Sequence, residues 1–258
     1  MSHDFIYFDS AYRFLCQKLL NSDNVRNTRE INNVHFTISD IETVTGTSRD
    51  IDIKYLMAEL IWYLAGKNDM NFINNFASLW GRISDDGVTN NSAYGYIIQK
   101  KYGFDQMKKI IELLKTDPFS RRAVINLNAA NENVIETKDE ICTIALQFLL
   151  RNNRLNCTAV MRSNDIWFGL PYDIVFFTTV QKLIADALGV AYGTYSHFAG
   201  SLHVYDKDVE KIKKVLQKVP IKPITINHQV LYEKADELYK IVNRENIIDK
   251  CLETGVLG

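Results

Sequence analysis

The stretch GLPYDIVFFTTVQKLIADALG, residues 169–189, is the most informative part of the chain for the fold. From Asp173 to Leu188 it is apolar on almost every side, which is typical of a helix buried in a protein interior. Gly189 follows, and glycine favours the left-handed conformation in which many helices end. Asp173 stands at the predicted start of the helix, where an aspartate commonly serves as an N-terminal cap. We therefore expect a long buried helix at the centre of the fold.

Upstream of this helix, two runs of apolar and β-favouring residues predict a hairpin. The runs Ile144–Leu150 and Leu155–Met161 are separated by Arg-Asn-Asn-Arg. Asparagine tolerates the positive φ of a tight turn, here expected at Asn152–Asn153. The other predicted strands are Arg122–Leu127, His203–Tyr205 and Ile224–His228. The other predicted helices are Asp4–Asn21, Tyr55–Ala65 with Gly66 at its end, Asp105–Lys115 and Asp206–Lys218.

The predicted strands and helices do not alternate regularly along the chain. That order favours an α+β fold, in which a mixed or largely antiparallel sheet is packed with helices around the long buried helix. The 258 residues, 47% hydrophobic and 24% charged, are enough for a large core and contain no linker-like tract. We expect residues 1–258 to form a single domain.

Charge and composition exclude several classes of protein. Thirty basic and thirty-one acidic residues give a formal charge of −1, which provides no electrostatic basis for binding nucleic acid. No run of eighteen apolar residues predicts a transmembrane helix, and the first fourteen residues lack the pattern of a signal peptide. The four cysteines, at positions 16, 142, 157 and 251, contain no CxxC pair. We therefore expect no zinc site, no disulfide framework and a location in a reducing cytoplasm.

Cys142 stands just before a predicted strand and close to two sets of arginines. A single cysteine is more often a small buried hydrophobic residue than a nucleophile, but nearby cations favour the reactive thiolate. Arg121-Arg122 lead directly into an apolar strand, and Arg162 opens the stretch RSND. Paired arginines usually face solvent or form salt bridges; here their planar donor groups also suit a phosphate.

Three other polar residues have both a structural and a functional interpretation. Glu59 lies in an apolar helix beside Trp62 and Tyr63, where it is either held by a hydrogen-bonding partner or placed to manage protons. His197 and His203 are each either a satisfied core histidine or part of a site. None of these signals decides the function alone.

Together, seven segments resemble the thymidylate synthase superfamily in its order and at nearly its spacing, from about residue 5 to about residue 230. The segments are Glu59–Gly66 (ELIWYLAG), Trp80 with Asp85-Asp86-Gly87 and Tyr94-Gly95, Asp117–Arg122 (DPFSRR), Cys142 with Gln147-Phe148, Arg162–Asp165 (RSND), Gly169–Tyr172 (GLPY) and His203–Tyr205 (HVY). The resemblance implies a catalytic domain that forms a homodimer and requires no metal. It also implies a pyrimidine nucleoside monophosphate as substrate and 5,10-methylenetetrahydrofolate as co-substrate.

The resemblance assigns roles to individual residues. Cys142 is the expected nucleophile that adds to carbon 6 of the pyrimidine, a step that makes carbon 5 reactive, and Glu59 organises water and proton transfer. The residues expected to hold the nucleotide are Arg26, Arg121, Arg122, Gln147, Arg162, Ser163, Asn164, Asp173, His203 and Tyr205. In the family, Arg121 and Arg122 reach into the site of the partner subunit. The residues expected to contact the folate are Trp80, Asp165 and Gly169.

Asp173 is the departure from the family that bears on the substrate. Thymidylate synthases have asparagine there, in Pro-Phe-Asn, whereas this chain has Pro171-Tyr172-Asp173. An amide both donates and accepts and so matches uracil, while an ionised carboxylate only accepts and matches the exocyclic amine of cytosine. An unpaired buried polar group costs about 1–3 kcal/mol, so Asp173 favours a cytidylate. Aspartate here resembles the deoxycytidylate hydroxymethylases of the superfamily, in which water captures the methylene group.

The sequence therefore predicts a folate-dependent dCMP 5-hydroxymethyltransferase, with Cys142, Glu59 and Asp173 in catalytic roles. A divergent thymidylate synthase or a dUMP hydroxymethylase is the alternative. Further departures from thymidylate synthases are Ile141-Cys142-Thr143, Gly200-Ser201, Arg26-Asn27-Thr28-Arg29, Ile83 and the tail Glu253–Gly258. Base modification of this kind suits a virus that marks its own DNA.

Other classes of protein fit the sequence less well. A cytidylate deaminase needs the zinc motifs H-x-E and P-C-x-x-C, which the chain lacks. A cysteine hydrolase would pair Cys142 with a histidine, but neither His197 nor His203 stands in a hydrolase motif. The presence of Cys142, Glu59 and Asp165 together argues against an inactive nucleotide- or RNA-binding member of the fold.

Overall fold

The computed structural model of the chain describes residues 3–129 and 136–258. The chain forms two compact units. The first consists of Met1–Ile51, Leu113–Val124 and Cys142–Ile224, and the second of Asp52–Glu112, Ile125–Ile141 and Thr225–Gly258. The expectation of a single domain stays a prediction. Within the described ranges there is no helix long and apolar enough to cross a membrane, and no cluster of His, Cys, Asp or Glu side chains arranged to hold a metal ion.

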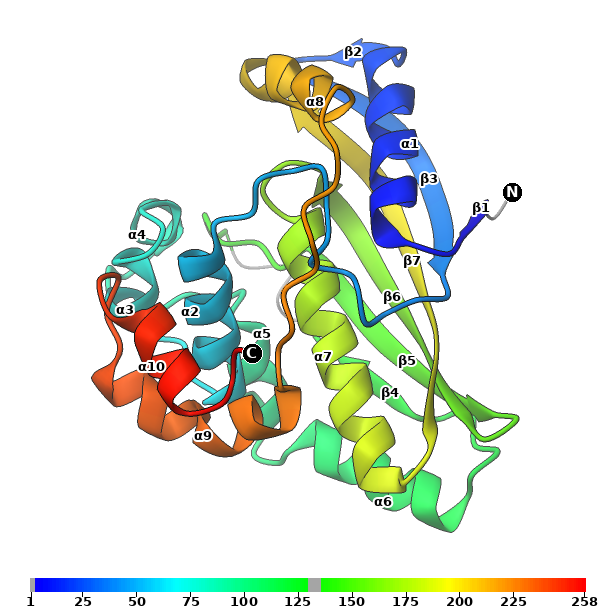
Figure 1. Ribbon diagram of the computed structural model, residues 1–258, viewed down its shortest axis with the longest axis vertical. Coiled ribbons are helices and arrows are strands. Elements are labelled where there is room, and N and C mark those ends of the chain that lie inside the picture. Colours follow the sequence, from blue (N-terminus) through cyan, green and yellow to red (C-terminus); the bar gives the residue numbers. More distant parts are fainter. Residues whose placement is uncertain (1–2, 130–135) are drawn as a thin grey trace. The chain divides into compact units, whose positions relative to one another are not determined.

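The first unit is built on a mixed sheet (Figure 1). Its strands are β1 (His3–Phe5), β2 (Asn24–Val25), β3 (Thr28–Ile38), β5 (Thr143–Arg151), β6 (Arg154–Asp165), β7 (Ala191–Tyr205) and the start of β4 (Val124–Asn126). The strand order is β1-β3-β7-β6-β5-β4, with β2 paired to β3. β5 and β6 form the predicted antiparallel hairpin, β6 and β7 are parallel, and β7 and β3 are antiparallel. Strands of both orientations packed with helices confirm the α+β prediction.

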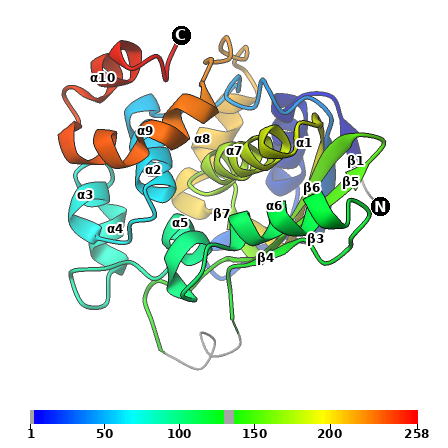
Figure 2. The same cartoon turned by 90° about the horizontal axis from the view of Figure 1, so that it is seen from below.

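Two helices pack on one side of this sheet. α7 (Leu170–Leu188) contacts β6 and β7, and α1 (Phe8–Leu20) contacts β3 (Figures 1 and 2). Every second residue of β6 from Leu155 to Met161 is buried, because alternate side chains of a strand face the helices. α7 is buried along most of its length, as its apolar circumference predicts, and ends at Gly189 with a φ of +66°.

Local turn signals identify several element boundaries correctly. Asn152 and Asn153 have φ values of +51° and +57° in the β5–β6 turn, as predicted. Gly66, with a φ of +61°, follows the end of α2 (Ile53–Leu64), which matches the predicted helix to within two residues. The predicted helix at Asp105–Lys115 is α6 (Gln106–Thr116).

Other predicted boundaries are wrong. The strand expected at His203–Tyr205 is only the end of the fifteen-residue strand β7. No strand forms at Ile224–His228, where Ile226 makes an isolated bridge with Leu257. The side chain of Asn227 caps α9 (His228–Ile241) by accepting from the Val230 N–H, so the helix begins at His228. The N-terminal helix starts at Phe8, after β1, and not at Asp4. The segment after Tyr205 is a 3₁₀ turn (Asp206–Asp208) followed by α8 (Val209–Val215).

The second unit consists mainly of helices. They are α2, α3 (Met70–Asn74), α4 (Leu79–Ile83), α5 (Tyr94–Tyr96), a π-helical turn (Ile97–Lys101), most of α6, α9 and α10 (Ile247–Glu253). α9 and α10 both pack against α2. All residues of α2 from Leu56 to Leu64 are buried, including Glu59, so α2 forms the centre of this unit and carries a carboxyl group inside it.

Candidate functional site

Cys142 lies directly before β5, beside a guanidinium group from the neighbouring strand. Arg162 Nη2 is 3.6 Å from Cys142 Sγ, and the Arg162 N–H donates to the Cys142 carbonyl at 2.9 Å. A cation at this distance favours the thiolate, which is the nucleophilic form of cysteine. The structure thus joins the predicted nucleophile to one of the predicted phosphate ligands.

The other three cysteines differ from Cys142 in their surroundings. Cys16, Cys157 and Cys251 are buried, whereas Cys142 is half-buried. Burial raises the pKa of the Cys16 thiol to about 12 and that of Cys251 to about 11, and it raises the pKa of Cys157 further. Thiols in apolar surroundings stay neutral and unreactive. Cys142 is therefore the candidate nucleophile among the four.

Three of the predicted nucleotide ligands lie together near the ends of β6 and β7. Ser163 Oγ is 3.3 Å from His203 Nδ1. The rings of His203 and Tyr205 meet edge to face, with their centroids 5.4 Å apart. A hydroxyl, an imidazole and a phenol in one place form a polar cluster suited to a sugar and its phosphate.

The turn that carries Arg26 reaches the same end of the sheet. Thr28, at the start of β3, pairs with Tyr205, and the Asp206 N–H donates to the Asn27 carbonyl at 3.0 Å. Arg26 is exposed and has a φ of +59°, the left-handed conformation of this tight turn between β2 and β3. The backbone therefore places the Arg26 turn beside Tyr205.

Asp165 ends β6 and pairs with His203 on β7. Its Oδ1 accepts from the N–H groups of Trp167 at 2.6 Å and Phe168 at 2.9 Å. Burial raises the pKa of Asp165 and lowers the pKa of His203, while the attraction between their charged forms opposes both shifts. Titratable groups with shifted pKa values in one place are typical of sites that move protons.

Asp173 lies in the first turn of α7 and faces β6. Asn164 Nδ2 donates to Asp173 Oδ2 at 2.8 Å. Burial raises the pKa of Asp173 to about 7; the hydrogen bond from Asn164 opposes this shift and the charge of Asp165 adds to it. The N-terminal cap predicted at Asp173 is wrong, because the helix begins earlier and its cap position is Gly169. The carboxyl group of Asp173 therefore does not cap α7.

Because Gly169 has no side chain, it leaves space for the hydrogen-bonded side chains of Asn164 and Asp173. A Cβ atom on Gly169 would lie 2.8 Å from Asn164 Nδ2 and 3.0 Å from Asp173 Oδ2, closer than ordinary contacts allow. Gly169 also accepts a hydrogen bond from the Asp173 N–H at 3.0 Å. Its predicted contact with folate stays a prediction, whereas its packing against these two side chains is a feature of the structure.

Arg121 and Arg122 are exposed on the loop before β4. Gln147 Nε2 donates to the Arg121 carbonyl at 3.2 Å, and Arg122 lies 3.8 Å from Asp117 of the same loop. Gln147, predicted as a nucleotide ligand, thus holds the backbone that presents the arginines. Phe119 in this loop is 75% exposed.

Glu59 and Trp80 belong to the second unit, where a tyrosine joins them. Tyr55 Oη donates to Glu59 Oε1 at 2.5 Å, and Trp80 Nε1 donates to Tyr55 Oη at 3.1 Å. Sequence reasoning did not identify Tyr55. The signal was present, because Tyr55 and Glu59 are four residues apart on one face of a helix. The position of this cluster relative to Cys142 stays a prediction.

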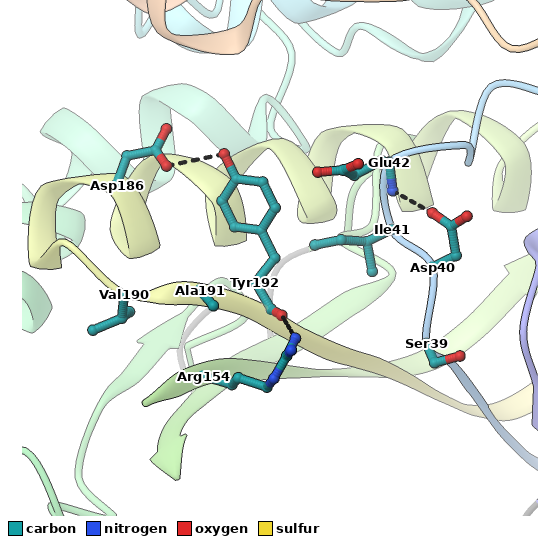
Figure 3. A pocket seen from close by; sticks show the side chains of 9 residues that line it. All are labelled: Ser39, Asp40, Ile41, Glu42, Arg154, Asp186, Val190, Ala191 and Tyr192. Carbon is teal, nitrogen blue, oxygen red and sulfur yellow. Dashed lines mark hydrogen bonds between the residues drawn. The ribbon is translucent and has the colours of Figure 1, made fainter. Parts of the chain in front are cut away.

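A hollow of about 490 Å³ near the C-terminal end of α7 contains none of the predicted site residues (Figure 3). Tyr192 Oη donates to Asp186 Oδ1 at 2.9 Å inside it, and Arg154 Nη1 donates to the Tyr192 carbonyl at 2.9 Å. It is lined by Ser39, Asp40, Ile41, Glu42, Arg154, Asp186, Val190, Ala191 and Tyr192. The largest group of predicted site residues instead lies around Cys142, Asp173 and His203.

Comparisons with known proteins identify the family of the chain. A deoxyuridylate hydroxymethyltransferase of Bacillus phage SP01 is 35% identical over 185 residues, which are 66% of this chain and 48% of that protein. The chain thus spans about half the length of this relative. Thymidylate synthases of Francisella philomiragia and Francisella tularensis subsp. holarctica are 26% identical over 194 residues, 68% of this chain and 69% of theirs. The family model described as thymidylate synthase matches residues 11–245, and the chain therefore belongs to the thymidylate synthase family.

Proposed function

We propose that the protein is a folate-dependent 5-hydroxymethyltransferase that acts on dCMP. The reaction combines dCMP, 5,10-methylenetetrahydrofolate and water to give 5-hydroxymethyl-dCMP and tetrahydrofolate. The transferred carbon keeps its oxidation level, so no separate oxidant or reductant is required. The observation that carries the proposal is the carboxyl group of Asp173, held by Asn164 at the position that reads the base in the family.

Cys142 starts the reaction in this proposal. Its thiolate, favoured by Arg162 at 3.6 Å, forms a bond to carbon 6 of the pyrimidine. The electron pair of the 5,6 double bond then makes carbon 5 nucleophilic toward the one-carbon unit. Loss of the proton from carbon 5 and departure of the Cys142 sulfur restore the ring. Glu59 orients the water that supplies the new hydroxyl group.

The nucleotide is held at the ends of β6 and β7 in this proposal. Arg162, Ser163 and the turn of Arg26 provide donors for the phosphate, and His203 and Tyr205 provide partners for the sugar hydroxyl. The support is the contact between Ser163 and His203 and the packing of His203 on Tyr205. Asn164 stays a predicted nucleotide ligand, and its amide nitrogen donates to Asp173.

Asp165, Gly169 and Trp80 are the residues assigned to the folate. Burial raises the pKa of the Asp165 carboxyl group because it destabilises the ionised form. Additional N–H donors would stabilise this ionised form. A pterin ring carries such donors, and the residue therefore fits this co-substrate. When bound, the folate supplies a one-carbon unit at the oxidation level of formaldehyde. No metal is assigned to the site.

Asp173 supplies the preference for cytosine. In its ionised form the carboxyl group is an acceptor for the exocyclic amine at carbon 4. The assay incubates the protein with methylenetetrahydrofolate and dCMP or dUMP, and identifies the products by mass. Formation of 5-hydroxymethyl-dCMP is expected, and formation of dTMP with dihydrofolate from dUMP would contradict the proposal. Asp173→Asn should move the preference toward dUMP.

Hydroxymethylation of dUMP is the second candidate. The relative from Bacillus phage SP01 is named a deoxyuridylate hydroxymethyltransferase. The pKa of Asp173 is raised to about 7, so a neutral carboxyl group with a donor for the 4-oxygen of uracil is accessible near neutral pH. In the same assay, 5-hydroxymethyl-dUMP as the main product would favour this candidate.

We also propose that the active protein is a homodimer in which Arg121 and Arg122 enter the partner's site. Both arginines are exposed, and the neighbouring Phe119 is exposed although it is apolar. On the sheet face opposite the helices, Val160 pairs with Phe198, which pairs with His35. A second subunit that covered this face would bury Val160, Phe198 and His35.

We also place the enzyme in the cytoplasm of a host cell and its product in viral DNA, in keeping with the phage relative.

A further inference from the structure

We infer that Asn164 is a second residue that determines base specificity, and that it acts through Asp173. This inference rests on the proposed function. Asn164 lies on β6 and is 2% exposed, whereas Asp173 lies on α7 and is half-buried. The Asn164 Nδ2 to Asp173 Oδ2 distance of 2.8 Å is that of a good hydrogen bond.

The direction of this hydrogen bond determines the chemistry of the carboxyl group. An amide nitrogen donates and does not accept, so Asp173 Oδ2 is the acceptor and any proton on the carboxyl group resides on Oδ1. The reverse orientation of the amide would set its oxygen against an ionised carboxylate. Within the described part of the chain, Asn164 provides the side-chain hydrogen bond to Asp173. Asn164 therefore selects Oδ1 as the oxygen that meets the base.

The protonation of Oδ1 then distinguishes the two bases. Ionised Oδ1 accepts from the exocyclic amine of cytosine, and protonated Oδ1 donates to the 4-oxygen of uracil. Asn164 stabilises the ionised form through its hydrogen bond, while the carboxyl group of Asp165 on β6 opposes it. Tyr195 on β7 also interacts electrostatically with Asp173. Asn164 thus shifts Asp173 toward the form that matches cytosine.

Two features indicate that the amide serves Asp173 and not the packing of the core. Asn164 Oδ1 is buried and, among the residues that the structure describes, has no hydrogen-bonding partner. Such a buried unpaired acceptor destabilises a protein, and an apolar side chain would avoid the cost. In addition, any side chain at Gly169 would displace the pair.

The test measures the ratio of kcat/KM for dCMP to kcat/KM for dUMP at pH 7.5, in the wild type, Asn164→Ala, Asp173→Asn and the double variant. Asn164→Ala should lower the ratio by about tenfold or more. In the Asp173→Asn background the same change should not lower the ratio further, because the carboxyl group through which Asn164 acts is absent. A merely structural role of Asn164 would not depend on Asp173 in this way.

The ratio compares two substrates on one preparation, so a partly unfolded variant still gives a valid value. Asn164→Leu, which fills the buried volume without a donor, serves as a second variant and should lower the ratio equally. Asn156→Ala is the matched control; Asn156 is also on β6, but it accepts from the Thr194 N–H at 2.9 Å. Its ratio should equal that of the wild type.

Three results would overturn the inference. If the ratio stays within twofold of the wild type in Asn164→Ala and Asn164→Leu, the inference is wrong while the proposed function stands. If Asn164→Ala lowers the ratio equally in the Asp173→Asn background, Asn164 does not act through Asp173. If the wild type converts neither nucleotide, the proposed function is wrong and the inference falls with it. A wild-type preference for dUMP contradicts only the choice of base, because a further fall of the ratio in Asn164→Ala still supports the inference.

Discussion

The hydroxyl group of Tyr55 donates to Glu59 Oε1 at 2.5 Å and accepts from the indole N–H of Trp80 at 3.1 Å. The directions follow from the chemistry of the groups, because an indole nitrogen only donates. The single proton of the Tyr55 hydroxyl is therefore directed to Glu59. Tyr55 thus connects the carboxylate assigned to water with the tryptophan assigned to folate.

Tyr55→Phe should lower kcat by about tenfold or more and leave KM for the nucleotide nearly unchanged. The variant removes a hydrogen bond to a charged group, worth about 1.5–3 kcal/mol, and leaves Glu59 less well oriented. Steady-state kinetics with saturating folate measure both constants. An unaltered kcat together with a normal pH profile would show that Tyr55 has no positioning role.

Tyr239→Phe is the matched control for this prediction. Tyr239 donates to Asp69 Oδ2 at 2.6 Å in the same unit, so the variant also removes a phenol–carboxylate hydrogen bond. It should lower thermal stability without changing kcat. If both variants lose stability equally and neither loses activity, the hydrogen bond of Tyr55 is structural.

Cys142 should be the cysteine that iodoacetamide modifies in the folded protein. Its sulfur is half-buried beside Arg162, whereas burial keeps the other three thiols neutral. Arg162→Leu should slow the alkylation by about tenfold at pH 7.5, because the thiolate loses its neighbouring cation. Mass spectrometry of the digested protein measures the rate at each cysteine.

Arg154→Leu is the control for alkylation, since Arg154 is on the same strand and donates to the Tyr192 carbonyl instead. Its alkylation rate should match that of the wild type. An equal rate in Arg162→Leu would mean that the guanidinium group does not activate Cys142. This experiment requires no substrate, so its result does not depend on the choice of base.

The parts of the fold that sequence reasoning identified depend on short-range signals. Gly66, Gly189 and the pair Asn152–Asn153 take positive φ values where a helix or strand ends, and these residue types favour that conformation. Strand β7 was recognised only at its end, because its many small and polar residues, such as Gly193, Thr194 and Ser196, hide its alternation. Pairing with β3 and β6 on both sides, which one sequence does not show, stabilises the whole strand.

Contacts between distant parts of the chain, which one sequence does not show, also limited the prediction of the candidate site. The order of the motifs predicted Cys142, Asp173 and His203 as site residues, but it did not predict which side chains contact each other. Asn164 was assigned to the nucleotide, and its contact with Asp173 depends on how α7 lies against β6. Tyr55 was missed because its role depends on the placement of Trp80 on a different helix.

Protonation of His197 should destabilise the folded protein in acid. Burial lowers the pKa of His197 to about 3, whereas a histidine in the unfolded chain has a pKa of about 6.5. Between these values the unfolded state binds more protons, so the free energy of unfolding falls as the pH falls, by up to about 1.4 kcal/mol per pH unit. His197→Phe should remove this part of the slope in urea unfolding measured from pH 4.5 to 7.5. An identical slope in the variant would show that another group is responsible.

The preference of the enzyme for dCMP over dUMP should rise with pH. The pKa of Asp173 is about 7, so the carboxyl group changes from donor to acceptor as the pH increases through this value. Titrations that affect both substrates equally cancel in the ratio of the two kcat/KM values. Between pH 6 and 8 the ratio should therefore follow the ionisation of the Asp173 carboxyl group. In Asp173→Asn the ratio should not change with pH over this range. A wild-type ratio that does not vary over this range would contradict the proposed reading of the base.

Mixing two inactive variants should restore activity if Arg121 and Arg122 act in the partner's site. Cys142→Ser lacks the nucleophile, and the double variant Arg121→Ala/Arg122→Ala lacks the donated arginines. In a mixed dimer, one site then has Cys142 from the second variant and both arginines from the first, whereas the other site has neither. An equal mixture that exchanges subunits freely contains about half mixed dimers, so about a quarter of the wild-type activity is expected.

The control for this complementation mixes Cys142→Ser with Arg162→Leu, because both residues belong to one subunit's site. In one site of this mixed dimer, Cys142 is present but lacks the Arg162 guanidinium group. In the other site, Arg162 is present but Cys142 is replaced by serine. Neither site is complete, so no activity is restored. Recovery in the first mixture and none in the second would place Arg121 and Arg122 across the interface. No recovery in either, with dimers present by sedimentation, would place them in their own subunit's site.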